Sequence, residues 1–168
     1  MDSRFLKKTL TDEEIEIVQA HLNEPEYLLK SLNKSPSAIA NQIKRVALKG
    51  TQYSYETSPE EICKDIIENL GISTINKREI QFEQYRMDFL IDNIDVEVQG
   101  TYFHCDPRFY QDGATNDTQA YMISKDKKRK DYIESRGYKV LYIWEHDLYV
   151  NREKCKELIG MAVLKSRN

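Results

Sequence analysis

The sequence predicts an α/β (α+β) protein in which a small helical segment precedes a mixed sheet flanked by helices. Residues 11–48 carry apolar residues at helical spacing between capping residues and prolines. Residues 79–99 alternate apolar and polar side chains, which is the period of a strand. Residues 116–166 return to helix, strand and helix in turn. With 168 residues, 40% hydrophobic and 32% charged, the chain can bury a core of ordinary size.

Residues 1–50 are expected to form three short helices. Thr11 followed by Glu14 is a capping box, which predicts a helix over TDEEIEIVQAHL. The phrase EPEYLLKSL supplies a second helix. Ser35 and Pro36 begin a third over NKSPSAIANQIKRVAL, because proline at the first helical position has no N–H to lose. The residues expected to face outward from this third helix are Ser37, Asn41, Gln42, Lys44 and Arg45.

Three short helices with a polar third helix resemble the helix-turn-helix modules of the Myb/SANT-like kind, with SPSAIANQIKRV in place of their recognition helix. The resemblance implies that residues 1–50 are a domain that binds double-stranded DNA through bases and phosphates. The alternative is a helical cap that only packs on the larger part of the chain. Residues 51–57 lack periodicity and are expected to be a linker, which leaves residues 58–168 as the second domain.

The second domain is expected to open with a helix over TSPEEICKDIIENLGI, capped by Thr57 or Ser58 and ended by Gly71. Two β-rich runs follow, EIQFEQYRMDFLID and IDVEVQG, joined by a two-residue turn at Asp92 and Asn93. A basic helix over 116–136 contains KDKKRK, YKVLYIWEHDL is a buried strand, and NREKCKELIGMAVLKS is a final helix. The expected order after the linker is therefore α-β-β-loop-α-β-α.

The predicted hairpin places two carboxylates face to face. Counting back from the turn sets Asp88 opposite Glu97, and Gln99 points to the same side as Glu97. Directly opposed residues have Cβ atoms about 4.5–5.5 Å apart, so like charges there repel. A divalent cation between them would explain the pair, and oxygen ligands suit Mg²⁺, with Mn²⁺ as an alternative. A solvated strand face is the simpler explanation.

The order of elements and four phrases resemble the PD-(D/E)xK nuclease superfamily, in particular its very-short-patch-repair (Vsr-like) branch. The phage homing endonucleases that share this catalytic domain belong to the same branch. The phrases are TSPEEICKDIIENLGI, YRMDFLID, VEVQGTYFHCD and SRGYKVLYIWEHDL, within residues 55–148. The resemblance implies a restriction-endonuclease-like mixed sheet and metal-dependent hydrolysis of phosphodiester bonds in DNA.

The resemblance also assigns residues to the site. Asp88 matches the central metal-binding aspartate, and Glu60, or its neighbour Glu61, matches a supporting glutamate of the opening helix. His104 closes the loop after the second strand and is a candidate general acid or base, with Asp106 in a trailing H-x-D element.

Tyr102 and Phe103 stand where the repair enzymes carry aromatic residues that wedge into the DNA stack. The basic run KDKKRK is either a solvated helix face or a phosphate-contacting one, through Lys125 and Lys128.

The chain departs from the superfamily at Gln99, where the superfamily carries a lysine. Activation of water must then depend on the metal, on His104, or on Lys125 or Lys128. The zinc-binding Cys/His set of the repair enzymes is not evident, which favours the homing branch. The enzymatic alternative is a repair or restriction-like nicking endonuclease. The non-enzymatic alternative is a DNA-binding regulator with a decayed nuclease fold.

Composition limits the remaining classes. No apolar run reaches the roughly 18–20 residues of a membrane span, and residues 1–14 lack a signal-peptide pattern, so a cytoplasmic protein with no membrane partner is expected. Cys63, Cys105 and Cys155 are expected to be reduced, buried thiols. The net charge of −3 conceals an acidic middle and a basic end, which suits a cation site flanked by phosphate-binding surfaces. A homodimer is left open.

Overall fold

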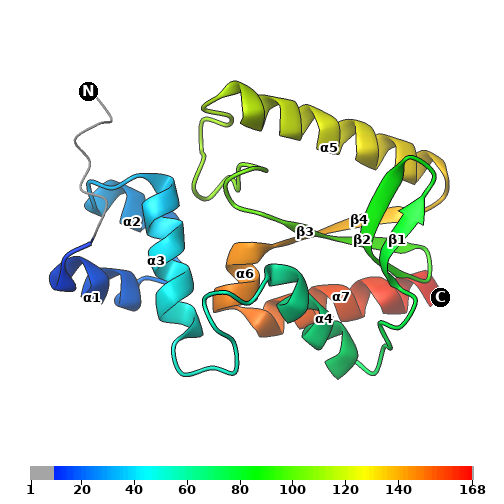
Figure 1. Ribbon diagram of the computed structural model, residues 1–168, viewed down its shortest axis with the longest axis horizontal. Coiled ribbons are helices and arrows are strands. Elements are labelled where there is room, and N and C mark those ends of the chain that lie inside the picture. Colours follow the sequence, from blue (N-terminus) through cyan, green and yellow to red (C-terminus); the bar gives the residue numbers. More distant parts are fainter. Residues whose placement is uncertain (1–9, 168) are drawn as a thin grey trace.

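The computed structural model describes residues 10–167 (Figure 1). Its elements, in chain order, are α1 (Asp12–Ala20), α2 (Pro25–Ser31), α3 (Pro36–Leu48), α4 (Pro59–Asn69), β1 (Arg78–Phe82), β2 (Tyr85–Ile91), β3 (Ile94–Gln99), α5 (Asp117–Ser135), β4 (Lys139–Trp144), α6 (Glu145–Val150) and α7 (Arg152–Arg167). The protein is thus a mixed α/β structure, as the sequence predicts.

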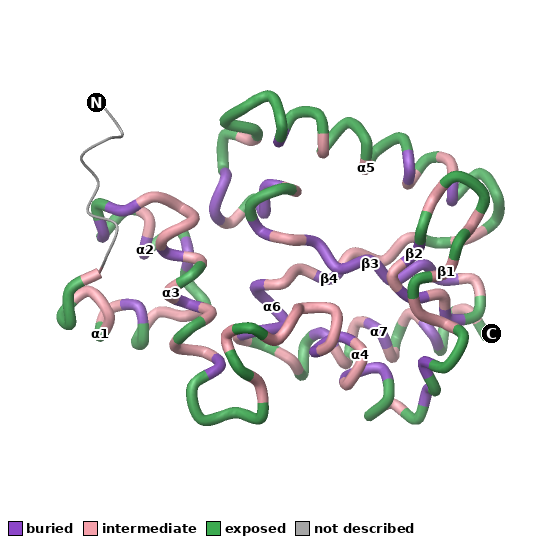
Figure 2. Tube along the Cα trace, in the orientation of Figure 1, coloured by how far each residue is buried: buried purple, intermediate pink, exposed green. Residues whose placement is uncertain are grey.

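The four strands form one sheet in the order β1-β2-β3-β4. The first three strands are antiparallel neighbours, and β4 runs parallel to β3. Helix α5 covers one face of the sheet, and α4 and α7 cover the other (Figure 1). The central strand β3 is buried along its whole length, whereas the outer side of α5 is exposed (Figure 2).

The predicted helix starts are confirmed. Thr11 and Glu14 form a complete capping box at α1, and Ser35 and Ser58 cap α3 and α4 through their hydroxyl oxygens. The two-residue turn between β2 and β3 is also confirmed, because Ile91 pairs with Ile94 across it.

Two strand predictions are wrong. The run EIQFEQYRMDFLID is two strands, β1 and β2, separated by Glu83 and Gln84. The alternation shifts by one residue there, from Ile80 and Phe82 to Tyr85, which is the signal of a turn inside an otherwise continuous β pattern. The segment YKVLYIWEHDL is also not one strand, because β4 ends at Trp144 and the next residues form α6.

Two apolar cores hold the molecule together. The larger lies between the sheet and helices α4, α6 and α7. The smaller joins α1, α2 and α3 to Cys105, Phe109 and Tyr110 of the loop after β3. The N-terminal helices therefore pack directly on the rest of the protein rather than hanging from residues 51–57.

Two further features of the fold are the state of the cysteines and the character of the helices. Cys63, Cys105 and Cys155 are free and buried, which confirms that prediction. Within residues 10–167, no helix combines the length and the apolar character needed to cross a membrane.

Candidate active site

Asp88 and Glu97 are neighbours on β2 and β3, in the predicted register. The pairing of Phe89 with Val96 and of Leu90 with Asp95 places Asp88 opposite Glu97. The Asp88 N–H donates to Glu97 Oε1 at 3.0 Å, and the Val98 N–H donates to Asp88 Oδ2 at 2.9 Å. Glu97 is only 9% exposed. A solvated strand face is therefore excluded as the explanation of this pair.

Positive charge reaches the pair from α5. Arg129 Nη2 lies 2.5 Å from Glu97 Oε1 and 2.8 Å from Asp95 Oδ2. The contact between Arg129 and Asp95 is an ion pair without hydrogen-bond geometry. Among the described residues, neither Asp95 side-chain oxygen therefore has a hydrogen-bond partner. We call Asp88, Asp95, Glu97 and Arg129 the β3 carboxylate cluster. The cluster contains three carboxylates and one guanidinium. The sequence predicts a metal ion at this place and does not predict the arginine.

Burial dominates the acid–base behaviour of the β3 carboxylate cluster. It raises the pKa of Asp88 and of Asp95 above the ordinary value. It raises the pKa of Glu97 to about 9, with further contributions from the charges of Asp88 and Asp95 that Arg129 offsets only in part. Glu97 therefore keeps its proton at neutral pH unless another cation joins the cluster.

A second carboxylate shares a cavity with Asp88. The cavity measures about 360 Å³ and is lined by Ser58, Glu60, Arg78, Glu79, Arg86, Asp88 and Phe89. After burial, the charge of Glu60 is the largest of the contributions that raise the pKa of Asp88. Glu61 instead pairs with Arg78 at 2.5 Å. Of the two glutamates left open by the sequence, Glu60 is the one that the structure brings to Asp88.

His104 lies at the other end of this region. Its backbone N–H donates to the Gly100 carbonyl at 3.2 Å, which folds the loop back on the end of β3. Its Nδ1 lies 2.5 Å from Asp126 Oδ2 of α5. His104 does not line the cavity that holds Asp88. At a rise of about 3.3 Å per residue, Gly100 lies about 10 Å farther along the chain than Glu97. The His104 loop therefore begins at a distance from the carboxylates.

Sequence reasoning missed two α5 residues that hold the site, Asp126 and Arg129. They lie one turn apart, so one helix supports both His104 and Glu97. The available signal was spacing, because Gln119, Asp126 and Arg129 share a helix face with buried Ile133. That face is polar, so the usual apolar stripe of an inward-facing helix is absent.

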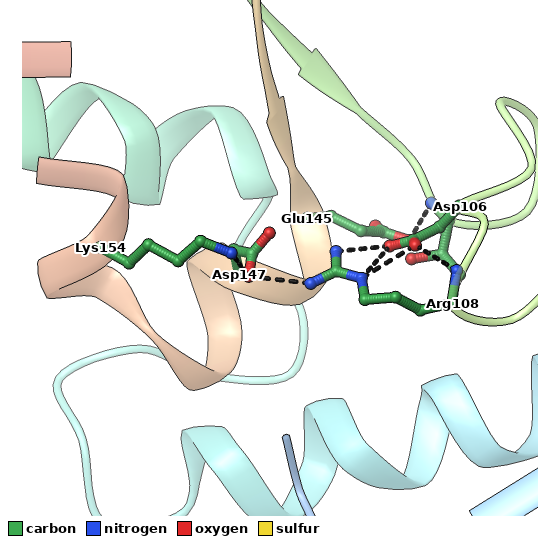
Figure 3. Close-up of polar contacts among 6 residues, drawn as sticks. Asp106, Arg108, Glu145, Asp147 and Lys154 are labelled. Carbon is green, nitrogen blue, oxygen red and sulfur yellow. Dashed lines mark hydrogen bonds and ion pairs between the residues drawn. The ribbon is translucent and has the colours of Figure 1, made fainter. Parts of the chain in front are cut away.

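Asp106 is placed differently from its predicted catalytic role. It is fully buried and receives hydrogen bonds from Arg108 Nε and Nη2 at 2.9 and 2.6 Å. Arg108 also reaches Asp147 at 2.8 Å, and Lys154 reaches Asp147 at 3.2 Å from the other side (Figure 3). We call these four residues the loop–α6 charge cluster. Because its oxygens are taken up within the fold, Asp106 is not supported as a catalytic residue.

The loop between Thr101 and Asp106 presents two aromatic side chains to solvent. Tyr102 is 42% exposed and Phe103 is 52% exposed, and their rings meet edge to face at 5.1 Å. Gln119 Nε2 donates to the Tyr102 carbonyl at 2.8 Å, and the Thr101 N–H donates to Glu145 Oε1 at 2.7 Å. These two bonds anchor the loop on either side, so the aromatic pair is held outward by the fold.

Helix α5 adds the two predicted lysines to the surface. Lys125 and Lys128 are exposed and make no ion pair within residues 10–167. Three positions apart, they are neighbours on the helix surface. Exposed aromatic rings can stack with bases, and exposed lysines can contact phosphates.

The polar face of α3 is less open than predicted. Only Asn41 and Arg45 are exposed, whereas Ser37, Gln42 and Lys44 are half-buried. All five side chains reach the surface at least in part, but three of them are partly covered by other residues.

Aromatic residues from elsewhere in the chain cover this face of α3. Tyr55 donates its hydroxyl to Asn41 Oδ1 at 3.2 Å, and its ring lies 4.4 Å from the Arg45 guanidinium. The Lys44 ammonium sits 4.8 Å from the Tyr55 ring and 5.0 Å from the Tyr149 ring of α6. Residues 51–57 and α6 thus take part in the surface that the sequence assigns to α3 alone.

The donor set fits a single Mg²⁺ with few protein ligands. Within residues 10–167, no three Asp, Glu, His or Cys side chains lie close enough together to enclose a metal ion. Asp88 and Glu97 each use one oxygen for a backbone N–H, which leaves the second oxygen of each. One or two carboxylates completed by waters and phosphate oxygens is the ordinary arrangement for Mg²⁺.

No family model, curated protein or solved structure matches the chain. The geometry of these residues is therefore the basis for assigning a function.

Proposed function

We propose that this chain is a metal-dependent DNA endonuclease that hydrolyses phosphodiester bonds, with a phage-type homing endonuclease as the nearest biological role. The observation that carries the proposal is the β3 carboxylate cluster, where buried carboxylates outnumber cations next to an open cavity. A mixed sheet flanked by helices, with this cluster on its central strands, agrees with the PD-(D/E)xK resemblance.

This proposal assigns a role to each residue of the site. Asp88 and Glu97 hold the metal, and Glu60 adds a carboxylate across the cavity. A bound Mg²⁺ supplies charge neutralisation on the phosphate and a more acidic water. His104, held by Asp126 outside that cavity, is the candidate for proton transfer, a role worth roughly 10²–10⁴ in rate where the DNA backbone brings the reacting oxygen to it. Gln99 is 5% exposed and carries no charge, so it can only orient its neighbours.

The direct test is cleavage of double-stranded DNA by wild type and Asp88→Asn, with Mg²⁺ and with EDTA. Loss of a metal ligand removes several kcal/mol of transition-state stabilisation, so we expect a fall of about 10³-fold or more with DNA binding retained. Asp92→Asn is the matched control, because Asp92 is an exposed aspartate on the same hairpin, paired with Arg167. Full activity in Asp88→Asn, or in excess EDTA, would overturn the proposal.

Two observations favour a second candidate, a DNA-binding protein without catalytic activity. Arg129 already lies against Glu97 and Asp95, so the cluster has an internal cation, and Gln99 replaces the lysine of the superfamily. This candidate predicts DNA binding without cleavage under any metal. A supercoiled plasmid substrate also separates the enzymatic alternatives, since a nicking enzyme gives open circles and a double-strand endonuclease gives linear DNA.

A further inference from the structure

The cavity in front of Asp88 presents an electrostatic problem for any phosphate that enters it. Three carboxylates line it, from Glu60, Glu79 and Asp88. A backbone phosphate is an anion, and like charges at close range in a partly buried site repel strongly. Among the described residues that line the cavity, the cations are Arg78 and Arg86.

The two arginines come from the paired strands β1 and β2 and line the same cavity. Arg86 and Asp88 share one face of β2, about 7 Å apart along the strand. The Arg86 carbonyl accepts a hydrogen bond from Arg129 at 3.0 Å, which ties its backbone to the β3 carboxylate cluster. Arg78 is held from the other side by Glu61 and lies 5.8 Å from the Phe89 ring.

Arg86 has a partner that a phosphate can replace. Its guanidinium lies 2.5 Å from Glu79, and both side chains are more than half exposed. Exposed ion pairs of this kind contribute only about 0–1 kcal/mol. A guanidinium binds phosphate through two parallel hydrogen bonds, which makes phosphate the better partner.

Glu79 itself marks a special position in β1. It has a φ of 55°, a left-handed conformation that is unusual for a residue with a Cβ inside a strand. Glu79 lies between Arg78 and Ile80, whose partners on β2 flank Asp88. Backbone strain of this kind clusters at functional sites.

We propose that Arg78 and Arg86 form a clamp that seats a backbone phosphate of DNA in the cavity in front of Asp88. The inference rests on the proposed function, since it names the groups that bring the substrate to that site. In the clamp, Arg86 exchanges Glu79 for the phosphate, while Arg78 keeps Glu61 and supplies a second, less mobile charge.

The test measures binding of a short duplex in EDTA across a series of salt concentrations, so that no cleavage is needed. Arg78→Gln and Arg86→Gln should each weaken binding about tenfold and lower the log–log salt slope by about 0.9. Arg136→Gln is the matched control, because Arg136 is an exposed arginine paired with Glu83 at the β1–β2 turn and does not line the cavity. It should leave both quantities unchanged.

Glu79→Gln gives an effect of opposite sign that misfolding cannot imitate. It frees Arg86 and removes one repelling carboxylate, so we expect duplex binding to tighten several-fold. In Mg²⁺, Arg86→Gln should also slow single-turnover cleavage at saturating DNA, because the phosphate is no longer positioned.

The outcomes separate this inference from the proposed function. If wild type cleaves DNA while Arg78→Gln, Arg86→Gln and Glu79→Gln all behave like Arg136→Gln, the clamp is refuted and the nuclease assignment stands. If the arginine variants lose binding and Glu79→Gln gains it while wild type cleaves nothing, the clamp stands and the nuclease assignment fails.

Discussion

The protein contains two clusters of charged residues, each built around buried carboxylates but with an opposite balance of charge. In the loop–α6 charge cluster, two carboxylates meet two cations, and Arg108 bonds to both Asp106 and Asp147 (Figure 3). Burial alone would raise the pKa of Asp147, but the hydrogen bond and charge of Arg108 outweigh it and the pKa is lowered. In the β3 carboxylate cluster, burial wins instead, and the pKa of every carboxylate is raised.

The difference indicates different tasks. A balanced, fully hydrogen-bonded cluster holds the loop after β3 against α6 and costs the fold little while it is intact. An unbalanced cluster lowers the stability of the metal-free protein, and such groups are retained where function needs them. Substitutions in the two clusters should therefore change stability by different amounts and with different pH dependence.

Breaking the balanced cluster should have the largest effect on stability. Arg108→Met leaves Asp106 fully buried without its charged partner, which typically costs about 3–5 kcal/mol. Urea denaturation at neutral pH measures the loss directly. A loss below about 1 kcal/mol would mean that the cluster does not hold the fold.

Neutralising the unbalanced cluster should stabilise the metal-free protein. The pKa of Glu97 is about 9 in the folded state and near 4.5 when unfolded, so folding retains a proton that unfolding releases. Wild-type stability therefore falls as pH rises from about 5 to 9, whereas Glu97→Gln lacks this loss. In EDTA at pH 8.5, Glu97→Gln should be more stable by about 2–4 kcal/mol, discounted for coupling within the cluster.

The control for that prediction is the same comparison at pH 5, where the two proteins should differ little. A Glu97→Gln variant less stable than wild type at pH 8.5 would show that the cluster is structural rather than strained.

His146 should produce the opposite pH dependence beside the balanced cluster. It is 3% exposed, and burial, followed by the charge of Arg108, lowers its pKa to about 4. Below about pH 6.5 the histidine binds a proton in the unfolded chain but stays neutral in the folded protein, so stability falls as pH drops toward 4. Between pH 7.5 and 5, wild type should lose about 2 kcal/mol more than His146→Gln. Equal losses would place the acid sensitivity elsewhere.

Lys154, at the exposed edge of the loop–α6 charge cluster, should contribute least to the free energy of unfolding. Lys154 pairs with Asp147, but its side chain is half exposed. Lys154→Met should cost less than about 1 kcal/mol, against several for Arg108→Met in the same denaturation series. A large loss in Lys154→Met would mean that the four residues act as one unit.

Local patterns carry the parts of the fold that the sequence predicts correctly. A two-residue turn fixes the register of a hairpin, so Asp88 could be placed opposite Glu97 from Asp92 and Asn93 alone. Capping residues are also local signals, so they predict the starts of α1, α3 and α4 correctly.

The errors at the candidate site come from interactions between distant segments, whereas the missed turn between β1 and β2 had a local signal. Arg129 looks like one more cation of a solvated basic helix, and only the packing of α5 on β3 shows that it meets Glu97. Asp106 looks free in the sequence, although Arg108 and α6 enclose it. Lys44 is partly covered by Tyr55 and Tyr149, which come from two other parts of the chain.

The central claim is that the β3 carboxylate cluster is unbalanced because it accepts a divalent cation. Calorimetric titration of the EDTA-stripped, dialysed protein with Mn²⁺ at pH 7.5, in two buffers of different ionisation enthalpy, tests it directly. We expect saturable binding with release of about one proton, from Glu97, since its pKa is about 9 without metal. Asp88→Asn should abolish this binding and Asp106→Asn should not. Absence of binding in wild type, or equal binding in Asp88→Asn, would mean that the β3 carboxylate cluster is not a metal site.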